Sequence, residues 1–411
     1  MARLLANHAK DKKMKDPILG ISKQIQEAKE QGTFKINATL GMFFDDEGEF
    51  LSYPTVQKTI DSLKPVEKYR YAPIDGGKNY HEVVKSWVFG KHKVHLESNM
   101  HIGVVASAGG TGAISNTFSN YLNHGDAILI PDIAWVYKKM AKEYHLKTQT
   151  YSLFTEDERF NVDSLKEEGR KLLDAQERLL IVINDPCHNP TGYTLKDSEW
   201  DEVFAFVNEV GEEGYPVVLL HDIAYLDYNP QGYDKAREVL SRYAGLHENI
   251  LGLIAFSGSK AFSSYGLRIG AQIALSKNPE VIEDFRHANQ VSSRAKWSNP
   301  TKIGVSLVEK LLGDKERVEA FQNELVSASE TLKRRGETFT ALAHEKGIEM
   351  HPYVGGFFVT IPSSDPQSLA DKLKEEGIFV AAMPSVVRIS LAAIDEKTVR
   401  TLLEDLHKVM T

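Results

Sequence analysis

Short apolar runs alternate with helix-like segments from about Lys93 to Leu275. This alternation is typical of βαβ units, in which helices cover both faces of a mostly parallel sheet. Several runs lack the every-other-residue pattern of a half-exposed strand, as expected of strands that are buried on both faces. The predicted strands are IGVVAS (102–107), AILIP (127–131), LLIVIN (179–184), VVLLHD (217–222), LIAFSG (253–258) and IGAQIAL (269–275).

The pattern changes after Pro300, where it becomes helical to about residue 346. Beyond it we expect a mixture of short strands and helices, which predicts a smaller α+β unit. The expected elements are GGFFVTIP (355–362), a helix near 366–376, IFVAAM (378–383), VVRISLAAI (386–394) and a closing helix. The segment before Tyr53 has turn signals of its own and is expected to join this unit. We therefore predict a large α/β domain over residues 54–315 and a small domain formed by 1–53 and 316–411.

Three predicted strands end directly in polar or glycine-rich segments, at residues 108–111, 185–192 and 222–225. In an open α/β sheet, ligands bind beyond the carboxyl ends of the strands. The sequence therefore predicts that the functional site lies at this edge of the sheet.

Composition narrows the class of protein. The chain has 411 residues, of which 42% are hydrophobic and 26% charged, as in an ordinary folded protein. Its net charge of -8 argues against nucleic acid or an anionic membrane surface as a partner. Cys187 is the single cysteine, so an intramolecular disulfide is excluded and a reducing cytoplasm fits best. The first fifteen residues lack the apolar run of a signal peptide, and no apolar stretch is long enough to span a membrane, so we expect a cytoplasmic protein. No HExxH pattern occurs, and we expect no metal site.

The segment Ser257-Gly258-Ser259-Lys260, followed by Arg268, lies where a predicted buried strand ends. A lysine amine in such a place can be desolvated, which lowers its pKa and suits it to form a Schiff base. Hydroxyl groups and a guanidinium beside it can hold a phosphate dianion. The sequence therefore predicts a lysine-bound phosphorylated cofactor.

These residues belong to a longer segment, SGSKAFSSYGLRIG (257–270), which resembles the cofactor-lysine motif of the fold-type-I pyridoxal-phosphate aminotransferases. Other motifs of that family follow in the expected order along the chain. They are AGGTGAI (108–114), NDPCHNPTG (184–192) and HDIAYLDY (221–228).

The resemblance extends nearly from end to end of the chain. Within the family, it is to the branch of aspartate and aromatic aminotransferases. The segments that carry it are DPILG (16–20), INATLGMFFDDEGE (36–49), YAPIDG (71–76), WVFG (87–90), RAKWSNP (294–300) and VRISLAAI (387–394). It implies a large domain of three αβα layers, a small domain made by both termini, and pyridoxal 5'-phosphate as cofactor. It also implies amino-group transfer between an amino acid and a 2-oxo acid by ping-pong chemistry, in a homodimer with shared active sites.

The resemblance assigns roles to the cofactor residues. Lys260 would bind the cofactor and later move the substrate Cα proton, and Asp222 would pair with the pyridine nitrogen. Tyr225 and Asn189 would hydrogen-bond the cofactor's phenolate oxygen. The remaining cofactor contacts would be Gly110, Thr111, Trp135, Ser257, Ser259 and Arg268, with Tyr71 from the neighbouring subunit.

For the substrate, the resemblance implies that Arg388 binds the α-carboxylate, assisted by Asn189 and Gly41. Arg294, from the partner subunit, would bind the distal carboxylate of aspartate, glutamate and their oxo acids. Aromatic-specific members of this branch can keep that arginine and swing it aside. The sequence therefore favours an aspartate aminotransferase-like enzyme and leaves an aromatic amino acid aminotransferase open.

Two positions depart from the pattern of the aspartate enzymes. Lys138 stands where a histidine usually supports the aspartate on the ring nitrogen, and Asn184 stands where a second histidine is frequent. These changes alter the surroundings of Asp222 and leave the cofactor prediction intact. Two other classes stay open: a pyridoxal-phosphate-dependent lyase on the same fold, and a binding or regulatory protein, against which the intact Lys260 and Arg388 argue.

Overall fold

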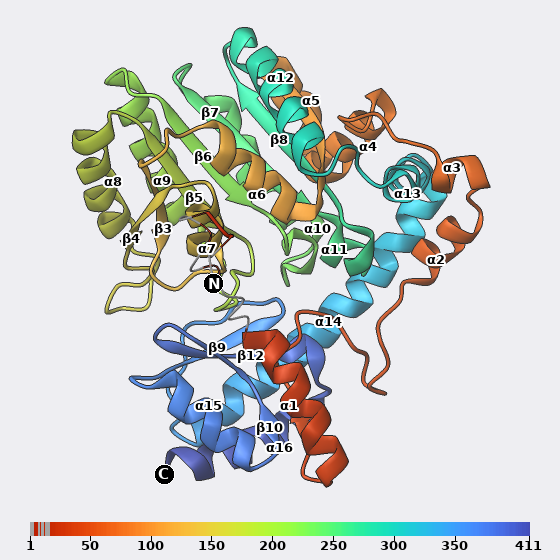
Figure 1. Cartoon of the computed structure of the whole chain (residues 1–411), viewed down its shortest axis with the longest axis vertical. Helices are drawn as coiled ribbons and strands as arrows, with labels where there is room; N and C mark the ends of the chain where they lie inside the picture. The colour runs from red at the N-terminus through yellow and green to blue at the C-terminus, as the bar shows by residue number, and fades with distance from the viewer. Residues whose placement is uncertain (1–3, 7–8, 10–11, 13–16) are drawn as a thin grey trace.

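The computed structural model describes residues 4–6, 9, 12 and 17–411 of the chain. They form a larger body around one long sheet and a smaller body around a short one (Figure 1). The α/β fold class expected from the sequence is confirmed. None of the described helices is long and apolar enough to cross a membrane.

The sheet of the larger body has seven strands in the order β2-β8-β7-β6-β5-β3-β4. Every neighbouring pair is parallel except the two that β8 makes with β2 and β7. The strands are β2 (His101–Ala108), β3 (Ala127–Pro131), β4 (Lys147–Tyr151), β5 (Leu179–Asn184), β6 (Val217–Asp222), β7 (Ile250–Ser257) and β8 (Ile269–Ser276). Each strand predicted in this region forms, whereas β4 was missed because its sequence, KTQTY, has no apolar run.

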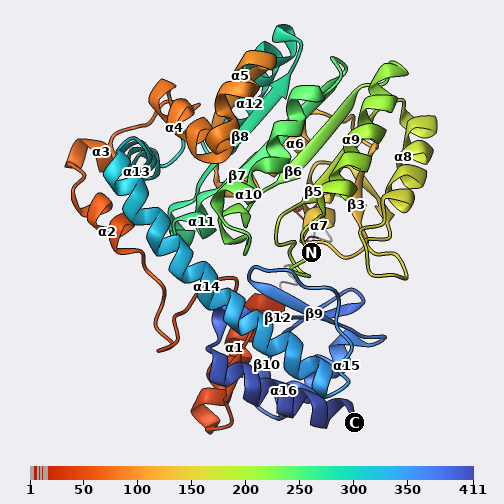
Figure 2. The same cartoon turned by 180° about the vertical axis from the view of Figure 1, so that it is seen from behind.

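Helices cover both faces of this sheet, as the uninterrupted apolar runs require (Figures 1 and 2). In β5, Leu180 and Val182 pack into the core under α6, α7 and α12, whereas Ile181 and Ile183 pack into the core on the opposite face, where α4, α8, α9 and α13 lie. The helices of this body are α2 (Pro54–Asp61), α3 (Pro65–Tyr69), α4 (Lys78–Phe89), α5 (Lys93–Asn99), α6 (Gly109–Asn120), α7 (Tyr137–Glu143), α8 (Val162–Gln176), α9 (Asp197–Glu212), α10 (Tyr233–Ala236), α11 (Gly258–Ala261), α12 (Pro279–Lys296) and α13 (Lys302–Leu312).

The smaller body is built from both ends of the described chain. Its antiparallel sheet has the order β11-β12-β9, and a separate parallel pair joins β1 to β10. The strands are β1 (Ile36–Asn37), β9 (Phe358–Pro362), β10 (Ile378–Phe379), β11 (Ala381–Met383) and β12 (Val386–Ser390), and the helices are α1 (Pro17–Gln31), α15 (Pro366–Glu375) and α16 (Glu396–Met410). The run expected at 378–383 is thus two short strands that pair with different partners.

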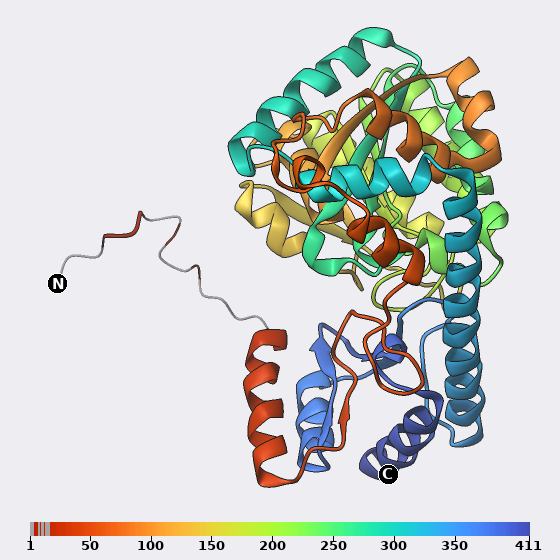
Figure 3. The same ribbon diagram turned by 90° about the vertical axis from the view of Figure 1, so that its right-hand side faces the viewer.

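A long helix, α14 (Lys315–Glu345), runs along both bodies (Figure 3). The division of the chain into 54–315 and 1–53 with 316–411 stays a prediction. Of the expected small domain, residues 1–3, 7–8, 10–11 and 13–16 lie outside the described residues.

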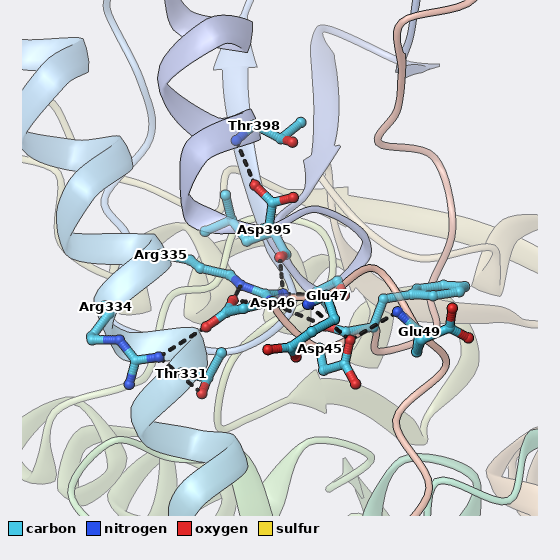
Figure 4. Close-up of polar contacts among 12 residues, drawn as sticks. Asp45, Asp46, Glu47, Glu49, Thr331, Arg334, Arg335, Asp395 and Thr398 are labelled. Carbon is cyan, nitrogen blue, oxygen red and sulfur yellow. Dashed lines mark hydrogen bonds and ion pairs between the residues drawn. The ribbon is translucent and has the colours of Figure 1, made fainter.

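Arg335 of α14 is fully buried and ties three segments of the smaller body together (Figure 4). Its Nη2 donates to Asp46 Oδ1 at 2.7 Å and to the Phe44 carbonyl at 3.0 Å, and its Nη1 donates to the Leu391 carbonyl at 3.1 Å. The guanidinium therefore fixes the segment after β1 and the segment after β12 against the same helix.

Candidate active site

The site lies at the carboxyl ends of β5, β6 and β7, where the sequence predicted it. The register sets Asn184 beside Asp222, and Asp222 beside Ala255. One pocket collects nearly all the side chains expected to act, together with several that were not expected. Its lining residues are Gly41, Gly110, Thr111, Ile114, Trp135, Asn184, Asn189, Asp222, Ala224, Tyr225, Ser257, Ser259, Lys260, Arg268, Phe358 and Arg388.

One end of the pocket is rich in hydrogen-bond donors. Helix α6 begins here at Gly109, whose φ of +71° lies in the region that favours glycine. A Cβ at Gly109 would come within 2.8 Å of Arg268 Nη2, so glycine lets this arginine lie against the helix end. Arg268 Nη1 donates to Ser259 Oγ at 3.2 Å. Free N–H groups at a helix N-terminus and a guanidinium form a site for an anion.

Lys260, in the short helix α11, lines the pocket, with its Nζ 5.6 Å from the centre of the Tyr225 ring. The pKa of Lys260 is lowered to about 8, mainly by burial; the charges of Arg268 and Arg388 act in the same direction, and the Asp222 carboxylate opposes them. Tyr225 is buried and accepts a long hydrogen bond, 3.4 Å, from Asn189 Nδ2. The amine is therefore more easily deprotonated than an exposed lysine.

Asp222 lies at the end of β6 and is buried. Its Oδ2 accepts a hydrogen bond of 2.7 Å from Tyr137 Oη, and its Oδ1 accepts one of 3.1 Å from the Ala224 N–H. Lys138, at the position where a histidine was expected in the aspartate enzymes, is exposed. Tyr137 was not predicted from the sequence, where the available signal was a tyrosine two residues after Trp135.

Asn184 was predicted only as a departure from the family pattern, yet its side chain makes two hydrogen bonds within the site. Its Oδ1 accepts from the Asn189 N–H at 2.7 Å, and its Nδ2 donates to the Asp222 carbonyl at 2.8 Å. The amide therefore joins the segment after β5 to the end of β6.

Arg388, in β12, brings a charge from the smaller body into the pocket. Its side chain is only 6% exposed, and it donates to the Thr39 carbonyl at 3.1 Å and to Asn189 Oδ1 at 3.3 Å. The guanidinium carbon lies 4.3 Å from the centre of the Phe358 ring. Arg388 Nε is buried without a hydrogen-bond partner among the described residues, and no carboxylate is paired with this arginine there.

Two expected residues do not lie in the pocket of their own chain. Tyr71 is 84% exposed. Arg294, near the end of α12, is also exposed, and its Nη1 donates to Ser298 Oγ at 2.7 Å and to Asn299 Oδ1 at 3.3 Å. Neither residue therefore completes the site within one chain.

Ile114, Ala224 and Phe358 line the pocket and were not predicted. Their apolar side chains gave no chemical signal, although Phe358 lies in a predicted strand. His188 and His221 lie outside the pocket lining: His188 Nδ1 contacts Thr191 Oγ1 at 2.9 Å, and burial lowers the pKa of both imidazoles. In the described part of the chain, no group of three or more His, Cys, Asp or Glu residues is arranged to hold a metal ion.

Comparison with known proteins identifies the class. Residues 37–406 match the family model of class I and II aminotransferases. The aspartate aminotransferase of Haemophilus influenzae is 28% identical over 96% of this chain and 98% of that protein. A crystal structure of an aminotransferase from Anaerococcus prevotii superposes with a TM-score of 0.94 at 32% identity, covering 99% of both chains. An aromatic-amino-acid aminotransferase from Burkholderia pseudomallei, covalently bound to pyridoxal phosphate, has the same fold with a TM-score of 0.80 at 22% identity and covers 99% of this chain and 100% of that one.

The chain therefore belongs to the class I and II aminotransferases. It is an aminotransferase whose cofactor is pyridoxal 5'-phosphate. The residues present fit that cofactor: the pocket holds a partly buried amine of lowered pKa, a buried carboxylate and, at one end, the donors expected for a phosphate.

Proposed function

We propose that this enzyme transfers the amino group of aspartate or glutamate to a 2-oxo acid. The observation that carries the proposal is Arg388: a buried guanidinium in the cofactor pocket, close to Asn189 and free of a carboxylate partner among the residues described. A buried charge is unfavourable unless it is paired, so this site favours an anionic ligand. The α-carboxylate of an amino acid fits a planar guanidinium through two parallel hydrogen bonds.

Pyridoxal phosphate, when bound, supplies an aldehyde that accepts amino groups and a ring that withdraws electrons from the substrate Cα. Lys260 Nζ would hold the cofactor and carry the Cα proton of the substrate. The Asp222 carboxylate would hold the proton of the pyridine nitrogen. Arg388 would fix the substrate so that its Cα–H bond lies within reach of Lys260 Nζ.

The cofactor's phosphate would be held by the N-terminus of α6 with Thr111, and by Ser257, Ser259 and Arg268, all of which line one pocket. Gly110 lies close to the Ser257 side chain, because a Cβ at Gly110 would approach Ser257 Cβ to 3.1 Å. Tyr225 and Asn189 would hydrogen-bond the phenolate oxygen, and Trp135 would stack on the ring. Gly41 would contribute to the substrate side of the pocket.

The spectrum of the loaded protein tests this proposal. Aspartate, glutamate, tyrosine and phenylalanine are added one at a time, without a 2-oxo acid. We expect aspartate and glutamate to convert the long-wavelength cofactor band into the pyridoxamine phosphate band, with formation of one equivalent of 2-oxo acid. Release of ammonia in place of a retained amino group would indicate a lyase and refute amino-group transfer.

An aromatic donor is the second candidate, because the pocket lining also includes the apolar side chains of Ile114, Trp135 and Phe358. The aromatic-amino-acid aminotransferase of Pseudomonas aeruginosa, 27% identical over 73% of both chains, supports this alternative. Conversion of the band by tyrosine and phenylalanine but not by aspartate would establish the aromatic function.

We also propose a cytoplasmic homodimer in which Tyr71 reaches the phosphate, and Arg294 the distal carboxylate, of the partner's site. The exposure of both side chains in one chain supports this assembly. Light scattering should give twice the mass of 46.0 kDa. Mixing inactive K260A with weakly active R294A should restore activity, because a hybrid dimer has one site with neither change, and cell fractionation tests the compartment.

A further inference from the structure

We propose that the Tyr137 hydroxyl positions the carboxylate of Asp222, by donating the hydrogen bond that holds Oδ2 in place for pairing with the pyridine nitrogen of the cofactor. The distance from Tyr137 Oη to Asp222 Oδ2 is 2.7 Å, between residues 85 positions apart in the chain. This inference rests on the proposed role of Asp222. The neutral phenol of Tyr137 would support the Asp222 carboxylate, whereas Lys138 is exposed.

Tyr137 is held rigidly, so its hydroxyl has a defined direction. It begins α7, is 1% exposed and packs in the core formed with α6 and α12. Its ring meets that of Trp135 edge to face, with centroids 5.5 Å apart and planes at 79°. Because Trp135 lines the cofactor pocket, one short segment supplies both the stacking side chain and the support of the carboxylate.

Asp222 is fixed from several sides. The Ala224 N–H donates to Oδ1, Asn184 Nδ2 donates to the main-chain carbonyl, and Tyr137 is the side chain that donates to Oδ2. Without Tyr137 the carboxylate could turn about its side-chain bond, since its other oxygen alone would be held.

The hydrogen bond from the Tyr137 phenol affects the protonation of Asp222. Burial raises the pKa of Asp222, and the hydrogen bond from Tyr137 opposes that rise, so it favours the anionic form that can accept a pyridinium proton. Burial also raises the pKa of Tyr137 well above 10, so its hydroxyl keeps its proton at neutral pH. An imidazole ordinarily titrates near neutral pH, whereas a phenol does not.

The test compares Y137F with Y151F. Tyr151 is an equally buried tyrosine, at the end of β4, and does not line the pocket. We expect Y137F to lower kcat of the amino-donor half-reaction by about 10- to 100-fold, the usual effect of losing a hydrogen bond to a charged group. KM for the amino acid should change by less than about threefold. The dissociation constant of pyridoxal phosphate from the cofactor-free protein should rise by about tenfold or more, whereas Y151F should match the wild type in all three.

A double-mutant cycle with D222E tests whether Tyr137 acts through Asp222. If it does, Y137F lowers kcat and cofactor affinity much less in the D222E protein than in the wild-type protein. Equal losses in both backgrounds, or a Y137F protein with unchanged kcat and cofactor affinity, overturn the inference. D222A separates this result from the proposed function: if D222A keeps full activity, the role of Asp222 itself is wrong.

A second variant covers the case in which Y137F does not fold. Tyr137→3-fluorotyrosine keeps the hydroxyl and nearly the same shape but makes it a stronger acid. We expect the pH midpoint of the cofactor absorption band to shift in this protein and to stay unchanged in Tyr151→3-fluorotyrosine. Equal midpoints in the two proteins overturn the inference.

Discussion

Capture of pyridoxal phosphate by the cofactor-free protein should follow the titration of Lys260. Burial, with help from the charges of Arg268 and Arg388, lowers the pKa of this amine from 10.5 to about 8 against the opposing effect of Asp222. The neutral amine is the nucleophile. At pH 7 about 9% of such an amine is neutral, compared with about 0.03% of an ordinary lysine, so the fraction available as a nucleophile should be about 300-fold higher.

The assay is stopped-flow absorbance of the cofactor-free protein mixed with pyridoxal phosphate from pH 6 to 10. Because deprotonation creates the nucleophile, the rate should rise with pH, by about tenfold between pH 7 and pH 9, and then level off. The reaction of Nα-acetyl-lysine with the same cofactor shows the behaviour of an exposed amine, whose rate continues to rise toward pH 10.

Lys296 provides a matched control, because burial lowers its pKa to about 8 as well and it lies outside the pocket lining. K296Q should leave the rate and its midpoint unchanged, and K260A should abolish covalent capture. A midpoint near 10.5 in the wild-type protein, or the loss of the titration in K296Q, would refute the reasoning.

Three further predictions concern Arg388, Asp46 and Asn184. R388K should lower kcat/KM for the amino acid by about 10- to 100-fold, because lysine cannot bind a carboxylate through two parallel bonds; R400K, on the exposed face of α16, should show wild-type steady-state kinetics. D46N should lower the free energy of unfolding in urea by about 1–2 kcal/mol, since it removes the charge paired with buried Arg335 while Asp46 itself stays partly in water; an unchanged midpoint would contradict this. N184A should weaken cofactor binding in a fluorescence titration by about tenfold, because it removes the two hydrogen bonds by which one amide links the Asn189 N–H to the Asp222 carbonyl.

The sequence predicted those parts of the site that follow from strand ends. Apolar runs such as LLIVIN and VVLLHD mark buried strands, and the parallel register then brings Asn184 and Asp222 side by side. The contact of Tyr137 with Asp222 could not be predicted in this way, because it depends on where α7 packs and not on any local pattern. The roles of Tyr71 and Arg294 depend on a second chain and stay predictions.

In the smaller body, too, a pairing depends on packing that the local sequence does not predict. The apolar run at 378–383 predicted one strand, yet Ile378–Phe379 pairs with β1 and Ala381–Met383 with β12. No periodicity within this run distinguishes the two partners, because both halves are buried or nearly so. The first half of the run pairs with β1, which comes from a distant part of the chain, so its partner cannot be seen in the run itself.

The pairing of β1 with β10 also has a consequence for the order of events during synthesis. Ile36 is bonded beside Ile378, so about 340 residues must be translated before the partner strand exists, which takes about 17–70 s at ordinary rates of elongation. The seven strands of the long sheet, in contrast, all lie between His101 and Ser276 and can associate before the last third of the chain has left the ribosome. Strand β1 therefore stays unpaired while the long sheet folds, and it is the part of the nascent chain for which we expect a chaperone to matter most.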